Sequence, residues 1–434
     1  MVLVLKLTLT SPPDHKALEA LASAFNKLVE DGGKVGFVKV YSYPAGDSLA
    51  AQLFASRRLM AAGVRPVLGV SLRPPKPEGP TLLLGYDSVN VRAGEAEYTV
   101  LAINSGELRG KPSINVYLVE GDGSVSAITL AAVAGSIGYK GGWDAMLALA
   151  GSYLGRYSGR EGRLHGLDKF MAEELMRVDS YSLETYTGLR VYKPHHGDAC
   201  KALSRTSNPY YPSITGDEEY CREALEAQGV GRLASQNLAS LSARGEEEVA
   251  RLVEAVIEVV RERGAWARFD EQVIDEYLGG FIISRQPLNP LQDLRMAADT
   301  IVYSAEVGGL HALASIAADL EVEYQVAERS LEDYSERLPD AVEAAKPRRL
   351  KLQTKHRVYL VDGGRGDSPY LLWKALSLLG QVERDSIIVL NVEGERIASP
   401  VQAEAAGGSG TVRRLVETRL FEGEGLRLWL RASA

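Results

Sequence analysis

The stretch VGFVKVYSYPAGDSLAAQLFASRRLMAAG, residues Val35–Gly63, shows the pattern that decides the fold class. Its first nine residues, up to Tyr43, are apolar or aromatic at most positions and predict a buried β-strand. Asp47 is a natural N-cap for a helix that runs from Ser48 to Gly63. A strand followed at once by a helix is the repeating unit of a layered α/β domain, so this stretch predicts that class.

The same alternation continues on both sides of this stretch. Met1–Lys6 has the character of a strand and lacks the basic start and cleavage site of a signal peptide. Further strands are expected at Arg65–Leu72, Thr81–Leu84, Tyr98–Ile103 and Ile114–Leu118, and helices at Ala127–Ile137 and Trp143–Tyr153. Residues 1–160 therefore predict an α/β domain with a largely parallel sheet.

The rest of the chain divides into a helical middle region and a small α/β unit. In residues 161–345, Glu246–Arg263 has one apolar helical face, and Leu291–Ala317 and Leu320–Leu338 also predict helices. In residues 346–434, a strand, a helix and two further strands are expected at Val358–Val361, Pro369–Leu379, Ser386–Val392 and Leu426–Leu430.

Composition narrows the functional classes. The 434 residues carry a net charge of −8, which argues against a broad surface that coats nucleic acid. No run of about 18 apolar residues predicts a membrane span. The two cysteines, Cys200 and Cys221, lie outside any CxxC pair, so we expect two inert thiols, no zinc site and a reducing cytoplasm.

Three motifs resemble those of a known family. They are ALSRTSNPYYPSITGDEEYCREAL at Ala202–Leu225, PLQDLRMA at Pro290–Ala297, and AGSIG at Ala134–Gly138. They are similar to motifs of the archaeal RecJ-like proteins, the GINS-associated nucleases of the DHH phosphoesterase superfamily. The resemblance implies an N-terminal DHH-type domain with a parallel sheet, a helical middle region and a small C-terminal DHHA-type α/β domain. Active members hold two divalent metal ions with aspartates and histidines, and the ions activate water.

The positions that match those metal ligands carry other residues here. The first aspartate motif is matched at Tyr43–Asp47, with Pro44 and Gly46 at the aspartate positions. The aspartate of the second motif is matched by Gly85, the DHH motif by a segment containing Asn104 and Ser105, and the last aspartate by Tyr139. We therefore expect no metal, no cofactor and no catalytic residue.

This loss of ligands is similar to that in the replication factor CDC45. The similarity implies a non-catalytic DNA-replication factor, a scaffold whose partners are the GINS complex and the MCM helicase. Single-stranded DNA is a further candidate partner, and no membrane is expected.

Two alternatives stay open. A divergent metal-dependent exonuclease for single-stranded DNA would use displaced ligands such as Asp47 and Asp87. A single-stranded-DNA-binding protein would use the basic patch at residues 346–357 and a glycine-rich turn after it, with the candidate residues Arg348, Arg349, Lys351, Lys355, Arg357 and Arg365. A metal cluster at His195-His196 with Asp198 and Cys200 is less favoured than a surface or packing role.

Overall fold

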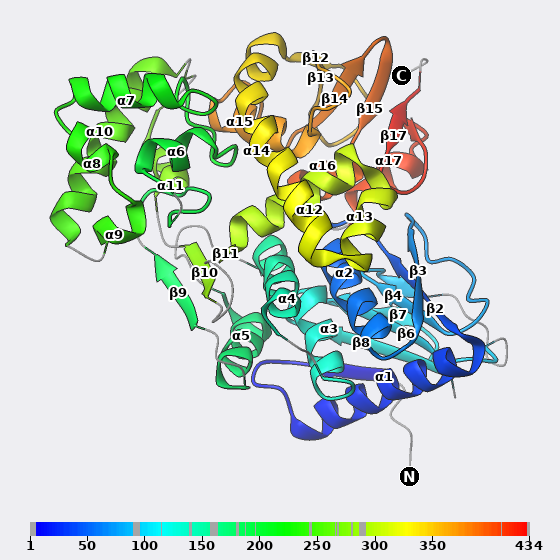
Figure 1. Cartoon of the computed structure of the whole chain (residues 1–434). Coiled ribbons are helices and arrows are strands. Elements are labelled where there is room, and N and C mark those ends of the chain that lie inside the picture. The colour runs from blue at the N-terminus through cyan, green and yellow to red at the C-terminus, as the bar shows by residue number, and fades with distance from the viewer. Residues whose placement is uncertain are drawn as a thin grey trace.

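The computed structural model describes residues 6–89, 96–113, 115–138, 141–156, 164–178, 182–186, 188–195, 197–242, 245–264, 266, 269–278, 281–285, 292–408 and 410–431. Figure 1 shows an N-terminal α/β domain, a separate lobe of helices, and a second sheet near the C-terminus, with a group of helices lying between them. None of the helices in these residues is long and apolar enough to cross a membrane.

The N-terminal domain is built on a six-stranded sheet in the order β1-β8-β6-β4-β2-β3, in which the paired strands run parallel. The strands are β1 (Lys6–Leu9), β2 (Phe37–Ser42), β3 (Arg65–Val70), β4 (Thr81–Leu84), β6 (Val100–Ser105) and β8 (Val116–Gly121). The helices are α1 (His15–Val35), α2 (Gly46–Ala61), α3 (Val125–Ala134), α4 (Gly141–Arg156) and α5 (Gly166–Val178). Two short strands, β5 (Ser88–Val89) and β7 (Arg109–Gly110), pair beside the sheet. The predicted parallel α/β class is confirmed.

The lobe of helices has a hydrophobic core of its own. It contains α6 (Ala199–Ser204), α7 (Glu218–Ala227), α8 (Gly231–Ala234), α9 (Leu238–Ser242), α10 (Glu246–Arg263) and α11 (Glu271–Tyr277). The apolar face of α10 supplies buried side chains such as Leu252 and Val256, as its periodicity predicts. A three-stranded antiparallel sheet connects this lobe to the rest of the chain, through β9 (Ser182–Tyr186), β10 (Phe281–Arg285) and β11 (Gln292–Asp293).

Two cysteines of this lobe correct a prediction. Cys200 of α6 and Cys221 of α7 are joined by a disulfide, so the prediction of two unlinked thiols is wrong. Because α6 and α7 pack against each other, the two Cα atoms lie 5.6 Å apart, within the range that a disulfide spans. The sequence separation of 21 residues does not reveal this approach.

Three helices join the parts of the molecule: α12 (Leu294–Val307), α13 (Gly309–Ala318) and α14 (Leu320–Ala344). They share the core of the N-terminal domain, where α12 contacts both α2 and α4. The prediction of a single helix over Leu291–Ala317 is wrong. Helix α12 ends before Gly308, and Gly309 has a φ of +65°, which a continuous helix does not allow. Leu291 lies outside the described residues. The division at residues 160 and 345 stays a prediction.

The C-terminal sheet has the order β12-β13-β14-β15-β17-β16. Its strands are β12 (Arg348–Leu350), β13 (Val358–Asp362), β14 (Ile387–Val392), β15 (Glu395–Ala398), β16 (Phe421–Glu422) and β17 (Leu428–Leu430). The helices are α15 (Pro369–Leu378), α16 (Pro400–Gly407) and α17 (Thr411–Glu417). Ser368 and Ser399 cap α15 and α16, and a proline follows each serine at the first helical position.

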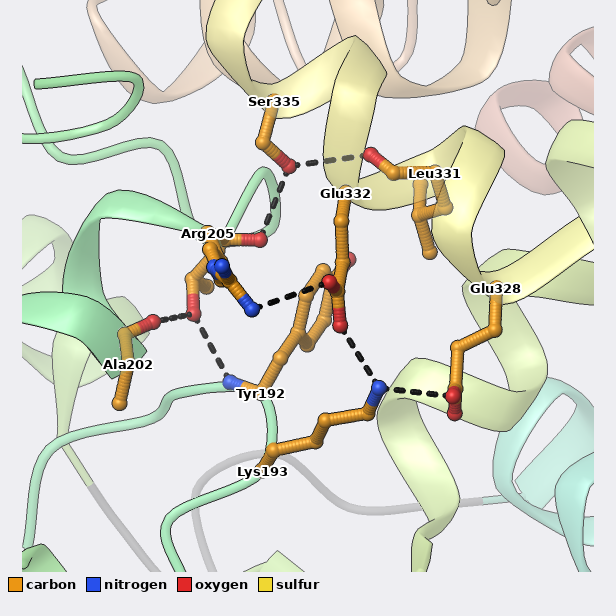
Figure 2. A network of polar contacts seen from close by, with 9 residues as sticks. Tyr192, Lys193, Ala202, Arg205, Glu328, Leu331, Glu332 and Ser335 are labelled. Carbon is orange, nitrogen blue, oxygen red and sulfur yellow. Dashed lines mark hydrogen bonds and ion pairs between the residues drawn. The ribbon is translucent and has the colours of Figure 1, made fainter. Parts of the chain in front are cut away.

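A polar network attaches the lobe of helices to α14 (Figure 2). Lys193 Nζ lies 2.7 Å from Glu328 Oε2 and 2.7 Å from Glu332 Oε1. Arg205 Nη1 pairs with Glu332 Oε2 at 3.2 Å, and Ser335 Oγ donates to the Arg205 carbonyl at 2.9 Å. The glutamates are mostly buried, so these pairs hold the lobe in one position against the helix better than exposed pairs would.

Candidate functional site

The predicted ligand positions meet at one edge of the N-terminal sheet. Gly46, Gly85, Asn104 and Ser105 all line a pocket of about 250 Å³ at the carboxyl ends of β2, β4 and β6. This is where parallel sheets place their ligands. Pro44, two residues before Gly46 in the chain, is buried. Tyr139 lies outside the described residues. Residues of α16 and α15 close the pocket from the C-terminal side, among them Glu404 and Tyr370.

Neighbouring side chains fill the space that carboxylates would need at two of these positions. Gly85 has a φ of +80°, and a Cβ atom there would overlap Ser48 Oγ and lie 3.0 Å from Ser48 Cβ. A Cβ atom on Gly46 would lie 3.1 Å from Leu154 Cδ1. Packing therefore opposes a side chain at Gly85 in particular, in addition to the strain of its left-handed backbone.

The polar residue at the DHH-motif position has a partner within its own loop. Asn104 ends the buried part of β6 and is 8% exposed. Its Nδ2 donates to the Glu107 carbonyl at 3.1 Å. A neutral amide that is already engaged in this way is a poor substitute for an anionic ligand of a divalent ion.

Asp47 supports a helix other than the one predicted. We expected Asp47 to cap α2, but α2 begins at Gly46, its cap is Ala45, and Asp47 lies in its first turn. Asp47 Oδ2 instead accepts from the backbone N–H of Val125, the first residue of α3, at 3.1 Å. Burial raises the pKa of the Asp47 carboxyl, and its main role in the structure is to satisfy this helix end.

Tyr43 and Glu404 connect the two sides of the pocket, and sequence reasoning missed this contact. The Tyr43 hydroxyl donates to Glu404 Oε1 at 2.5 Å, and the N–H of Val412 donates to the same oxygen at 2.8 Å. Burial raises the pKa of both Tyr43 and Glu404. The two residues are 361 positions apart, so no local pattern in the sequence signals the pair.

Asp87 lies in an adjoining pocket of about 360 Å³ and is held by two arginines. Arg413 Nη1 lies 2.7 Å from Asp87 Oδ1, and Arg109 Nη2 lies 3.1 Å from Oδ2. Burial alone would raise the pKa of Asp87, but the bonds and charges of Arg413 and Arg109 outweigh it and hold this pKa below its usual value. Asp87 therefore joins α17 to the N-terminal domain.

The six candidate cations for nucleic acid fall into two groups. Three have acidic partners: Arg348 pairs with Asp362 at 3.2 Å, Arg357 with Glu383 at 3.3 Å, and Arg365 with Glu393 at 2.5 Å. The other three, Arg349, Lys351 and Lys355, are exposed and form no salt bridge with any residue of the described chain. They lie on or just after β12, an edge strand of the C-terminal sheet.

The histidine loop is organised around helix α6. Asp198 caps α6 by accepting from the N–H of Lys201 at 2.9 Å, and it pairs with Arg222 at 2.7 Å. Cys200 is in the disulfide, and His196 lies outside the described residues. In the described part of the chain, no group of three or more histidine, cysteine, aspartate or glutamate residues could hold a metal ion.

Comparison with known proteins finds likeness in structure and not in sequence. No family model matches the chain, and no curated protein is similar to it. The crystal structure of CDC45 from Entamoeba histolytica is similar over 99% of this chain and 97% of that chain, with a TM-score of 0.58 at 10% sequence identity. RecJ from Thermus thermophilus in complex with Mn²⁺ matches 94% of this chain and 51% of that chain, with a TM-score of 0.38 at 14% identity. An exonuclease RecJ bound to manganese matches 94% of this chain and 89% of that chain, with a TM-score of 0.38 at 12% identity. The chain therefore shares the fold of CDC45 over nearly its whole length, as the resemblance in its sequence predicts.

Proposed function

We propose that the protein is a non-catalytic DNA-replication factor, a scaffold that binds the GINS complex and the MCM helicase. The observation that carries this proposal is the state of the pocket at the ends of β2, β4 and β6. Two divalent ions require several anionic or imidazole ligands, and the pocket offers glycine, asparagine and serine at the matching positions. The fold shared with CDC45 supports the same assignment.

The acids that remain near the pocket have structural partners. Asp47 accepts from the N–H of Val125, Asp87 pairs with two arginines, and Glu404 accepts from Tyr43. Binding a metal through Asp47 or Asp87 would disturb a contact that holds two parts of the fold together, whereas Glu404 keeps Oε2 without a hydrogen-bond partner. The contacts of Asp47 and Asp87 therefore disfavour a divergent exonuclease that would use these two aspartates as metal ligands.

A nuclease assay on the full chain tests the loss of catalysis. The protein would be stripped of metal, resupplied with Mn²⁺ or Mg²⁺, and incubated with end-labelled single-stranded DNA. We expect no metal-dependent products. Degradation that disappears in both Asp47→Asn and Glu404→Gln variants, with their melting temperatures unchanged, would overturn the proposal in favour of the exonuclease.

Co-purification tests the scaffold role. Affinity-tagged protein expressed at its native level should recover GINS and MCM subunits in near-equal amounts after washes at moderate salt. Recovery of neither complex, from extract in which both are intact, would refute the scaffold role even if the nuclease assay is negative.

A second candidate function is binding of single-stranded DNA. It is favoured by Arg349, Lys351 and Lys355, the cations that form no salt bridge within the described chain. Each lysine or arginine that contacts a phosphate of single-stranded DNA contributes about 0.7 to the slope of log affinity against log salt. Replacing all three by alanine should therefore reduce that slope by about two. The matched control replaces the paired residues Arg348, Arg357 and Arg365, and an equal reduction there would refute this assignment.

We assign the proposed function to the cytoplasm. Disulfides are rare in that compartment, with hyperthermophiles as an exception. The Cys200–Cys221 bridge makes this part of the proposal testable. The test is to label free thiols in living cells. If the cytoplasm is that of a hyperthermophile, where disulfides persist, both cysteines should stay unlabelled. Labelling of both cysteines would show that the bridge does not form in the cytoplasm.

A further inference from the structure

A small pocket lies where the lobe of helices meets α15, away from the site at the ends of β2, β4 and β6. Its volume is about 220 Å³. The lobe contributes residues from two separate segments, the loop after α6 and helix α11, and the C-terminal domain contributes α15 and the segment before β14. The lining residues are Asn208, Pro209, Glu276, Trp373, Lys374, Ser377, Leu378 and Arg384.

Two donors in this lining have no acceptor among the described residues. Trp373 is 5% exposed, and its indole Nε1 is buried without a hydrogen-bond partner. Lys374 Nζ lies 4.9 Å from the centre of the Trp373 ring and 5.6 Å from that of Tyr370, and it forms no ion pair within the described chain. A buried N–H and an ammonium group that both lack an acceptor indicate a place for an anion or for ordered water.

The nearby acids do not supply the missing charge. Glu276 is engaged by Arg384, whose Nη1 lies 3.2 Å from Glu276 Oε1. Asp299 accepts from the Tyr192 hydroxyl at 2.5 Å and from Asn208 Nδ2 at 3.2 Å.

Burial lowers the pKa of Lys374, and the positive charges of Arg295 and Arg384 lower it further. The negative charges of Glu276 and Asp299 raise this pKa but do not outweigh the lowering. The ammonium group is therefore partly buried and incompletely neutralised. A bound anion would supply the missing negative charge.

We propose that this pocket binds the phosphate group of a small anion, either free phosphate or a mononucleotide. Lys374 supplies the main charge, Arg384 a guanidinium donor at the rim that stays paired with Glu276, and Trp373 an indole N–H donor. A phosphate carries about two negative charges and three strong acceptor oxygens, which suits an ammonium group, a guanidinium group and a separate indole N–H better than a single carboxylate does. The small volume suits the phosphate group alone, so the sugar and base of a mononucleotide would lie outside the pocket, because pockets that enclose drug-sized ligands usually exceed about 300 Å³.

Calorimetric titration of the full chain in phosphate-free buffer tests the site. Inorganic phosphate should bind saturably at one site per chain. Lys374→Met keeps the apolar stem and removes the charge, so it should weaken binding at least tenfold, and Trp373→Phe should weaken it less. Lys355→Met, which removes an exposed lysine elsewhere, should leave binding unchanged. Titration with adenosine monophosphate distinguishes the sources: tighter binding than phosphate assigns the site to nucleotides, and weaker binding assigns it to free phosphate.

Melting temperatures separate a binding role from a purely structural one. Without phosphate, Lys374→Met should melt at or above the wild-type temperature, because the substitution removes a partly buried charge that has no acidic partner. With phosphate, the wild type should gain stability and Lys374→Met should not. Absence of saturable binding by the wild type would overturn the proposal, and so would equal binding by Lys374→Met. A lower melting temperature of Lys374→Met, with an unchanged response to phosphate, would instead identify the lysine as a structural element.

Discussion

Replacing Gly85 by alanine adds one methyl group at the end of β4, on the floor of the pocket that Asn104 and Ser105 also line. The methyl group is the first carbon of any larger side chain, including the aspartate that an active relative would have there. Gly85→Ala therefore measures how strongly the present structure opposes the return of a metal ligand at this position.

The expected destabilisation has two parts. A φ of +80° costs an alanine about 1–2 kcal/mol relative to glycine. Overlap with Ser48 Oγ adds a packing cost of about 1–3 kcal/mol, and rotation of the hydroxyl relieves it only in part because Ser48 Cβ remains 3.0 Å away. The sum is about 2–5 kcal/mol, a large fraction of the stability of an ordinary domain.

Gly106 provides a matched control at the end of the neighbouring strand β6. Its φ is +87°, and no atom lies within 4 Å of a Cβ placed on it. Gly106→Ala should therefore show only the backbone part of the cost. Urea unfolding of both variants, and of Ser48→Ala with and without Gly85→Ala, would isolate the packing part as the coupling between positions 48 and 85.

Two results would refute this reasoning. The first is an equal loss of stability in Gly85→Ala and Gly106→Ala, which would leave no packing contribution at position 85. The second is an absence of coupling between Ser48→Ala and Gly85→Ala. Either result would mean that Ser48 does not occupy the space of the missing ligand.

Three further predictions concern contacts that hold the parts of the molecule together. Burial raises the pKa of Asp299 to about 6 from an ordinary 3.8. This carboxyl therefore stabilises the fold below pH 4, and its contribution of about 3 kcal/mol is lost as the pH rises through 6. Asp299→Asn should flatten the decline in the free energy of unfolding that urea titrations measure between pH 4 and 7. Arg413→Met should cost about 1 kcal/mol by breaking the half-exposed pair with Asp87, and a cost no larger than that of Arg431→Met, an exposed pair, would contradict its role between domains. Cys200→Ala should lower the stability of the helical lobe by about 3 kcal/mol, given the 21-residue separation, and reductant should destabilise the wild type equally but not the variant.

Local patterns in the sequence were sufficient for most of the regular structure. The predicted strand at Thr81–Leu84 and helix at Glu246–Arg263 match β4 and α10 in both bounds, because β4 is a short, fully buried run that ends before Gly85 and α10 has one apolar face and ends before Gly264. The break at Gly308–Gly309 was missed, since apolar residues continue through it on both sides. Helix α1 was not predicted although its apolar face is well defined.

The candidate site was only partly accessible from sequence. The family resemblance assigned Gly46, Gly85 and Asn104 to one metal centre, and the structure places them around one pocket at the carboxyl ends of the parallel strands. What closes that pocket comes from the far end of the chain, through Tyr43–Glu404 and Asp87–Arg413. Such contacts depend on how domains dock, and no periodicity or motif encodes them. The pairing of the two cysteines was missed because it depends on how α6 packs against α7 within one lobe.

The placement of α12 has a consequence for how the protein is made. The sides of α2 and α4 that α12 contacts belong to the first part of the chain to leave the ribosome, whereas α12 follows only after the whole helical lobe. At ordinary rates of synthesis this delay is roughly ten to thirty seconds. During that time a broad apolar surface on the nascent domain has no cover, which makes it a natural substrate for chaperones that act during translation.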